Sequence, residues 1–300
     1  MEFSVSFDYL TITGKHAFSF ENSVFAHRVA ASALWARMEE LGIEHSRVWE
    51  SGSRHPFYEF TFRDDDYKID AFMSLDGETQ GWMIRLGGEA LRMQPYPAQI
   101  IAAAKQAGCR ITRLDVAFDF IGCEETTDAV YAAYEGRQKA GRTLKTQVVY
   151  SSTGTTFYLG SRSSERMLRI YDKGRQQGLD VTWTRIELEL KGALANLNAE
   201  AIASDQRIAA AMITDILPLR GLRIVDTLAD YADGADVEIV RARAPESDTV
   251  RWFRTQVLAA FKNLLKRDYA AALSVLEEYE AAVRDAERLR EGNEEGFTDV

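Results

Sequence analysis

Two nearby stretches decide the fold: TTFYLGSRSSERMLRIYDKG at residues 155–174 and WTRIELELKG at residues 183–192. Each contains an alternation of apolar and polar residues, which is typical of a strand with one buried face. The alternation predicts strands at 167–172 and 184–190 that lie side by side. The sequence therefore predicts two neighbouring strands with an apolar underside and a charged upper face.

The charged upper face would hold a tyrosine, several cations and two carboxylates. Tyr171 lies between Arg169 and Lys173 on the first strand, and Glu187 and Glu189 lie on the second. A tyrosine hydroxyl is a poor nucleophile at its ordinary pKa of about 10, but a neighbouring cation or metal favours the phenolate. Beside so much positive charge, phosphate is the natural electrophile. The alternative is an ordinary strand tyrosine on a solvated face.

A third strand, RLDVAFDF at residues 113–120, adds carboxylates of its own. Asp115 and Asp119 lie opposite its apolar residues, with about 7 Å between every second residue. Pairing with the second strand would crowd them beside Glu187 and Glu189, where like charges repel unless a cation is present. All-oxygen ligands suit Mg²⁺ or Mn²⁺, so these carboxylates are candidate metal ligands. A network of surface salt bridges is an equal alternative.

The first two thirds of the chain predict an α+β fold of antiparallel sheets flanked by helices. Residues 4–108 and 110–195 each follow the order strand, helix, four strands, helix, which indicates an internal duplication. Any α+β chain admits some such division, so the repeat is a hypothesis. The expected strands are 4–13, about 47–49, 57–62, 67–73, 82–86, 112–120, 146–150, 155–159, 167–172 and 184–190, and the expected helices are 21–41, 97–107, 125–139 and one from about 193.

The last third of the chain predicts helices only. They are expected at 199–213, 222–232, 249–265 and 268–290. We therefore expect one domain over 1–195 that carries the charged face, followed by a helical C-terminal region over 196–300.

Composition and charge limit the classes of function. The net charge of −10 argues against DNA binding by the chain as a whole, because Lys and Arg supply that affinity. The acid is concentrated near the C-terminus, however, and charge must be read locally. Arg162, Arg166 and Arg175 make the region of the first stretch basic. A DNA partner is therefore compatible with the sequence.

Several common sites are absent from the sequence. It has no phosphate loop, no dinucleotide fingerprint, no Ser-centred nucleophile elbow and no pair of histidines at metal-binding spacing. Its two cysteines make neither a disulfide framework nor a metal knuckle. We see no signal-peptide pattern and no apolar run that could cross a bilayer. We therefore expect a soluble, cytoplasmic protein without a membrane partner.

Taken together in order, RLDVAFDF, YLGSR, RIYDKG and RIELELKG resemble the replication initiation factor family. FDYLTIT and GWMIRLGGEALRM resemble the first half of that family, so the resemblance covers roughly residues 5–195. The family comprises rolling-circle initiators of small plasmids and filamentous phages, with related relaxases of integrative conjugative elements. The resemblance implies a metal-dependent, site-specific DNA endonuclease and ligase.

By this resemblance Tyr171 is the nucleophile, which forms a 5′-phosphotyrosyl link and leaves a free 3′-OH. Arg169 and Lys173 would hold phosphate or balance the phenolate. The best matches for ligands of Mg²⁺ or Mn²⁺ are Asp115, Glu187 and Glu189, with Asp119 as a fourth. The basic residues Arg162, Arg166 and Arg175 would contact the DNA backbone.

The sequence thus predicts a rolling-circle replication initiator that nicks and rejoins origin DNA, single-stranded or extruded at the nick. A relaxase of a conjugative element, with the same chemistry, is an alternative. A DNA-binding regulator without catalysis is an alternative from another class, and an interaction protein with merely solvated faces is a further one. The C-terminal helices would pack on the main domain, with a homodimer contact or a host helicase contact as alternatives.

Overall fold

The computed structural model describes residues 1–15, 26–46, 49–50, 55–74, 81–137, 144–152, 154–235, 258–278 and 280. The chain divides into two compact units, Met1–Ala242 and Arg243–Val300. The first unit therefore ends well beyond residue 195, the boundary expected from the sequence. The reason is packing, because the helices that follow residue 191 lie against the sheet and against one another.

The described part of the first unit contains both strands and helices, and the second unit is helical where it is described. The strands are β1 Glu2–Gly14, β2 Trp49–Glu50, β3 Phe60–Asp64, β4 Ile69–Ser74, β5 Gly81–Gly87, β6 Arg110–Ile121, β7 Thr146–Ser151, β8 Gly154–Leu159, β9 Arg166–Asp172 and β10 Trp183–Lys191. The helices are α1 Ala26–Glu40, α2 Gly88–Met93, α3 Pro97–Gln106, α4 Thr127–Arg137, α5 Lys173–Gln176, α6 Gly192–Ser204, α7 Arg207–Ile216, α8 Arg223–Ala232 and, in the second unit, α10 Leu258–Arg267. Helical residues 269–278 follow α10.

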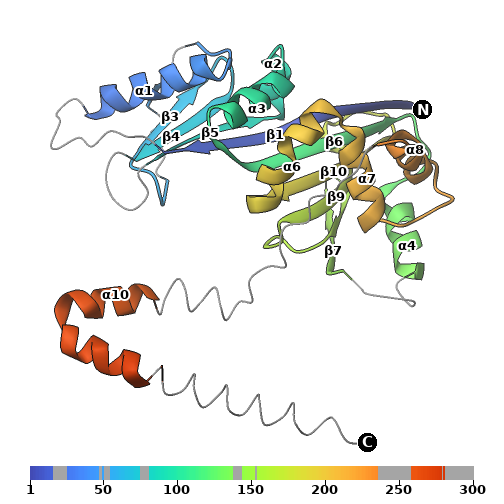
Figure 1. Ribbon diagram of the computed structural model, residues 1–300. Coiled ribbons are helices and arrows are strands. Elements are labelled where there is room, and N and C mark those ends of the chain that lie inside the picture. The colour runs from blue at the N-terminus through green and yellow to red at the C-terminus, as the bar shows by residue number, and fades with distance from the viewer. Residues whose placement is uncertain are drawn as a thin grey trace, which may run out of the picture. The chain divides into compact units, whose positions relative to one another are not determined.

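The ten strands form one antiparallel sheet in the order β2-β3-β4-β5-β1-β6-β10-β9-β8-β7 (Figure 1). The order has a centre between β1 and β6. From β1 the strands run outward as β5, β4, β3 and β2, and from β6 they run outward as β10, β9, β8 and β7. Each half begins with a strand, a helix and four further strands, interrupted among the described elements of the second half only by the one-turn α5. Helices α2 and α3 end the first half, and α6 follows the last strand of the second. The α+β fold expected from the sequence is confirmed.

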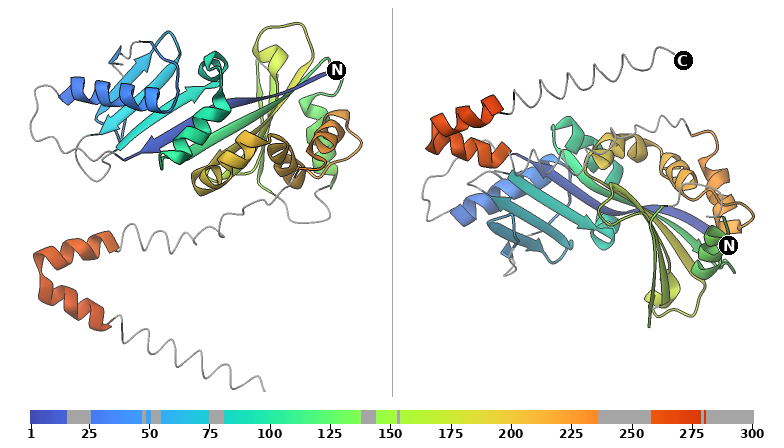
Figure 2. Two further views of the ribbon diagram at one scale, coloured as in Figure 1. Left: turned by 45° about the horizontal axis from the view of Figure 1, so that its top comes forward. Right: turned by 90° about the horizontal axis from the view of Figure 1, so that it is seen from below.

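Helices cover one face of this sheet, as Figure 2 shows for α1, α3 and α6. The covered face carries the apolar side of the alternation, for example Leu114, Phe118 and Ile170, which are fully buried. Burial of each such side chain stabilises the fold by about 1.5–3 kcal/mol. These residues join with the helices in a single hydrophobic core that runs through both halves. We call the opposite face, which carries Asp115 and Glu187, the polar face.

Two helical segments differ from the expectation. The short helix α2, which begins at Gly88, is not among the helices expected from the sequence. The helix expected at 199–213 is broken between α6 and α7. At the break Asp205 leaves the helical conformation, with φ −147° and ψ 101°, and its carboxylate accepts a hydrogen bond from the backbone N–H of Arg207 at 3.0 Å.

One strand is shorter than expected. The segment predicted at 57–62 begins at Phe60, because a turn closed by a bridge between His55 and Tyr58 precedes it. Parts of other expected elements lie outside the described residues, namely 21–25, 47–48, 138–139, 249–257, 279 and 281–290. No helix in the described part of the chain is long and apolar enough to cross a membrane.

Candidate functional site

Strands β6, β10 and β9 are neighbours, and their register gathers the predicted carboxylates on the polar face. Asp115 of β6 lies opposite Glu189 of β10. Glu187 of β10 lies opposite Arg169 of β9. Residues directly opposite each other in an antiparallel pair share a face. The pairing between the second and third strands of the sequence pattern is therefore confirmed.

The three carboxylates are buried rather than solvated. The side chains of Asp115, Glu187 and Glu189 are 0%, 1% and 5% exposed. Arg113 donates hydrogen bonds to Asp115 at 2.6 Å and to Glu189 at 2.7 Å. Arg169 lies 3.2 Å from Asp115 and 2.6 Å from Glu187. Burying an unpaired carboxylate away from water costs free energy, so the two guanidinium groups stabilise the cluster.

The donor set has the chemistry that a hard divalent cation prefers. Oε2 of Glu187 and Oε1 of Glu189 are buried without a hydrogen-bond partner. Arg169 and Lys191 approach these oxygens as ion pairs, but without hydrogen-bond geometry. Within the described ranges, no group of three or more His, Cys, Asp or Glu side chains is placed to hold a metal. Arginine, Arg113 included, neutralises the carboxylates in this arrangement.

Tyr171 donates its hydroxyl hydrogen to Oε1 of Glu187 at 2.5 Å. Burial raises the pKa of Tyr171, and the charge of Glu187 raises this pKa further. The sequence suggested instead that neighbouring cations would favour the phenolate. Lys173 is more distant, with its Nζ 5.8 Å from the centre of the Tyr171 ring. Because burial also raises the pKa of Glu187, this carboxylate is a better proton acceptor than usual.

A second charged cluster lies beside the tyrosine and centres on Arg185, the cross-strand partner of Tyr171. Arg185 donates to both oxygens of Asp119, at 2.7 and 2.8 Å. The indole N–H of Trp183 also donates to Asp119, at 2.5 Å. Arg185 lies 3.7 Å from Glu187. Asp119, the fourth predicted metal ligand, thus has both oxygens engaged in holding Arg185.

Asp8 completes this second cluster, although the sequence alone did not single it out. Its Oδ1 accepts a hydrogen bond from Arg185 at 2.9 Å. Simple alternation puts Asp8 on the same face as Leu10 and Ile12, which are buried in the core. A β-bulge between Phe7 and Tyr9 shifts the register there. A bulge redirects the side chains that follow it, so alternation assigns the wrong face.

The three arginines predicted to contact DNA are not gathered at the carboxylate cluster. Arg162 is exposed in the turn that follows β8. Arg175 is exposed on α5 and forms an ion pair with Asp172. Arg166 lies opposite a core residue and pairs with Asp215 of α7 at 3.1 Å, so it belongs to the helix-covered side. Of the three, Arg162 lies on the polar face, because its guanidinium is 5.6 Å from the ring of Tyr158, the cross-strand partner of Arg169.

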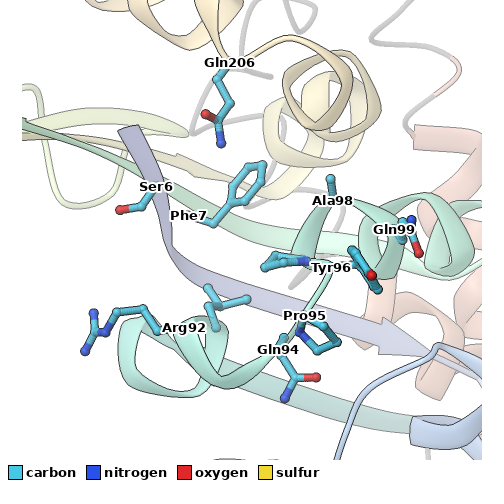
Figure 3. Close-up of a pocket in the computed structure, with 11 residues that line it drawn as sticks. Ser6, Phe7, Arg92, Gln94, Pro95, Tyr96, Ala98, Gln99 and Gln206 are labelled. Atoms are coloured by element: carbon cyan, nitrogen blue, oxygen red, sulfur yellow. The ribbon is translucent and has the colours of Figure 1, made fainter. Parts of the chain in front are cut away.

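A pocket of about 490 Å³ lies elsewhere, where β1 passes the corner between α2 and α3 (Figure 3). Phe7, Arg92, Tyr96 and Gln206 are among its lining residues, and Figure 3 shows Phe7 between Gln206 and that corner. None of the residues predicted for chemistry lines it. The pocket and the charged cluster are therefore separate features.

A sequence model of the replication initiation factor family matches residues 109–281. The match covers more than half of the chain, so the protein belongs to this family. It begins just before β6 and includes α10, whereas the resemblance in the motifs was placed at residues 5–195. The carboxylate cluster and Tyr171 lie inside the match, and the first half of the sheet lies outside it.

The fold is similar to that of a rolling circle replication initiator protein from Geobacillus stearothermophilus. The TM-score is 0.57 at 19% sequence identity, over 77% of this chain and 97% of that chain. At this identity the likeness shows the fold alone. No curated protein sequence matches the chain.

Proposed function

We propose that the protein initiates rolling-circle replication by nicking and rejoining origin DNA through a covalent link to Tyr171. The observation that carries the proposal is the hydrogen bond from the Tyr171 hydroxyl to Glu187, 2.5 Å long, within a buried cluster of carboxylates and arginines. Membership of the replication initiation factor family supports DNA as the substrate. A hydroxyl beside a buried base is the usual arrangement of an activated nucleophile.

In the forward step, Glu187 takes the proton of Tyr171 while the phenolate oxygen attacks the phosphorus of a phosphodiester. The bond from phosphorus to the 3′ oxygen breaks, and that oxygen leaves with the electron pair and takes up a proton. The 5′ phosphate stays bonded to Tyr171. In the reverse step the 3′-OH attacks the phosphotyrosyl bond, and Glu187 returns the proton to the tyrosine. One phosphoester replaces another, so no nucleotide is needed for rejoining.

The charged neighbours would position the phosphate and keep the tyrosine in place. Arg169 is 27% exposed, so its guanidinium can reach both Glu187 and a phosphate in solvent. For Asp115, Glu187 and Glu189 to hold Mg²⁺ or Mn²⁺, Arg113 and Arg169 would have to move away from them, because in the described residues these carboxylates are paired with arginine rather than grouped around a cation site. Such an ion, when bound, polarises a phosphoryl oxygen and stabilises the leaving oxygen.

The test is a denaturing gel of the protein after incubation with a pool of single-stranded oligonucleotides of randomised sequence and Mn²⁺. A 3′ label should stay with the protein and a 5′ label should not, because the 5′ phosphate of the downstream fragment is the bonded group. Tyr171→Phe should form no adduct, and Tyr150→Phe, on the exposed edge strand β7, should form as much as wild type. An adduct in Tyr171→Phe would disprove the nucleophile. Binding of the oligonucleotides in a native gel, without an adduct of wild type in the denaturing gel, would indicate a non-catalytic regulator.

A further inference from the structure

The first half of the sheet carries an aromatic cluster centred on Phe72 of β4. The centre of the Phe72 ring lies 4.9 Å from that of His55 and 5.9 Å from that of Tyr58. The guanidinium carbon of Arg85 lies 4.3 Å over the Phe72 ring. At the outer side, the Phe57 ring lies 6.0 Å from His55, and Phe57 is 68% exposed. The cluster thus combines packed rings, a cation and an exposed aromatic side chain.

The register places this cluster on the polar face, together with the carboxylates. Arg85 of β5 lies opposite Thr11 of β1, and Thr11 lies opposite Arg113 of β6. Opposite residues share a face, so Arg85 and the Phe72 ring beneath it lie on the same side as Arg113. From β4 to β9 there are five steps between strands of about 4.8 Å, which puts Phe72 roughly 24 Å along the sheet from Tyr171.

The strands between the two clusters continue the same chemistry. The guanidinium carbon of Arg113 lies 4.2 Å over the ring of Tyr9 on β1. Arginine over an aromatic ring therefore occurs in both halves of the polar face. Burial and the charge of Arg85 lower the pKa of His55, which favours the neutral ring. Aromatic faces beside cations are the surfaces on which proteins hold single-stranded nucleic acid, since bases stack on the rings and cations contact the phosphates.

We infer that Phe57 and His55 stack with the bases, and that Arg85 contacts the phosphates, of single-stranded DNA that runs along the polar face from Tyr171. The buried ring of Phe72 supports these side chains from beneath. The inference rests on the proposed function, because it takes DNA as the ligand of this face. It gives the first half of the sheet a binding role: it holds the strand whose phosphodiester the second half cuts.

The experiment measures fluorescence anisotropy of a labelled oligothymidylate of about 16 nucleotides, the upper end of known single-strand site sizes. The protein is the full chain with Tyr171→Phe, which excludes covalent capture. Phe57→Ala and Arg85→Gln should each weaken binding by roughly tenfold. Arg85→Gln should also reduce the dependence of affinity on salt, whereas Phe57→Ala should leave it unchanged. The matched control is Tyr150→Ala, an exposed aromatic residue on β7, which should bind as tightly as the parent.

Thermal unfolding of each variant accompanies the binding measurement. If Phe57→Ala and Arg85→Gln bind like the Tyr150→Ala control, the cluster is a small packing core and the inference is overturned. The adduct assay with Tyr171 intact separates this result from failure of the proposed function. If both variants bind oligothymidylate more weakly but wild type forms no adduct, the inferred binding surface stands and the nicking chemistry is overturned. If wild type forms the adduct but both variants bind with unchanged affinity, the nicking chemistry stands and the inferred binding surface is overturned.

Discussion

The two halves of the sheet share a strand order but differ in what they carry on the polar face. Leu86 of β5 and Leu190 of β10 each lie two residues before a helix, and they pair with Leu10 and Leu114. These two pairs fix the correspondence between the halves. Counting along the paired strands from these leucines gives each residue of the carboxylate cluster a counterpart in the first half.

The counterparts are not acidic. At the places of Asp115, Glu187, Glu189 and Tyr171 the first half has Thr11, Met83, Arg85 and Ser74. One backbone arrangement therefore supports a buried charge cluster in one half and an aromatic cluster with a cation in the other. The comparison teaches that the backbone of the sheet sets only where a side chain lies and which face it is on. The identity of the side chains decides which half can carry chemistry.

The largest expected effect is in the second half, at the base. Glu187→Gln should slow adduct formation by about 100-fold or more, because an amide cannot take the proton of Tyr171. The rate is measured in a single turnover by quenching with denaturant. Glu200→Gln, an exposed carboxylate on α6, should react at the wild-type rate. An unchanged rate in Glu187→Gln would remove this residue from the mechanism.

The next effect compares an acid–arginine pair from each half. Asp115→Asn should cost about 2 kcal/mol in the free energy of unfolding, because two part-exposed arginines lose a buried anion. Asp70→Asn should cost less than about 1 kcal/mol, since Asp70 and Arg85 are 3.4 Å apart and both part-exposed. Urea unfolding of both variants gives the two values. Equal losses would mean that the burial of the second-half cluster has no energetic consequence.

A smaller effect concerns Arg185, whose counterpart in the first half is Gly81. Arg185→Lys should slow adduct formation by roughly tenfold, because an ammonium cannot hold Asp119 with two hydrogen bonds and also reach Asp8. The affinity for the oligothymidylate should stay unchanged, which separates positioning of the tyrosine from DNA binding. A loss of affinity with an unchanged rate would assign Arg185 to the DNA instead.

The smallest effect is a pH dependence in metal-free buffer. Burial raises the pKa of Glu187 above its ordinary value of 4.5, so the folded protein binds this proton more tightly than the unfolded chain. The resulting stability is present below pH 4.5 and is lost as the pH rises through the folded pKa. The stability of wild type minus that of Glu187→Gln should therefore fall as the pH rises from 4.5. A difference that grows with pH would contradict the buried position of the carboxylate.

The alternation of the sequence predicted much of the second half because a period of two is a local property. It placed β6, β9 and β10, their apolar faces, and Tyr171 with Glu187 on one side. It predicted a charged surface, however, whereas β10 is buried on both faces from Thr184 to Leu190. That burial depends on arginines from three different strands. The sequence pattern of a single strand does not reveal which arginines of other strands will lie beside it.

Other features depend on irregular backbone, which periodicity does not encode. The bulge beside Asp8 changes the face of that residue. The aromatic cluster needs the turn at 55–58 to lie over Phe72, which only the folded chain brings about. The helix break at Asp205 accompanies a local hydrogen bond from the backbone N–H of Arg207 to the Asp205 carboxylate, within a run of helical spacing. In each case a local interaction overrides the pattern of apolar residues.

The most direct test of the account is to identify the residue that becomes bonded to DNA. Trypsin cleaves after Arg169 and Lys173, so the adduct is digested and the fragment from Ile170 to Lys173 is sought by mass spectrometry. The account predicts that this fragment carries a nucleotide through the phosphate on Tyr171. A nucleotide on any other tyrosine or serine would contradict the claim that Tyr171 is the nucleophile.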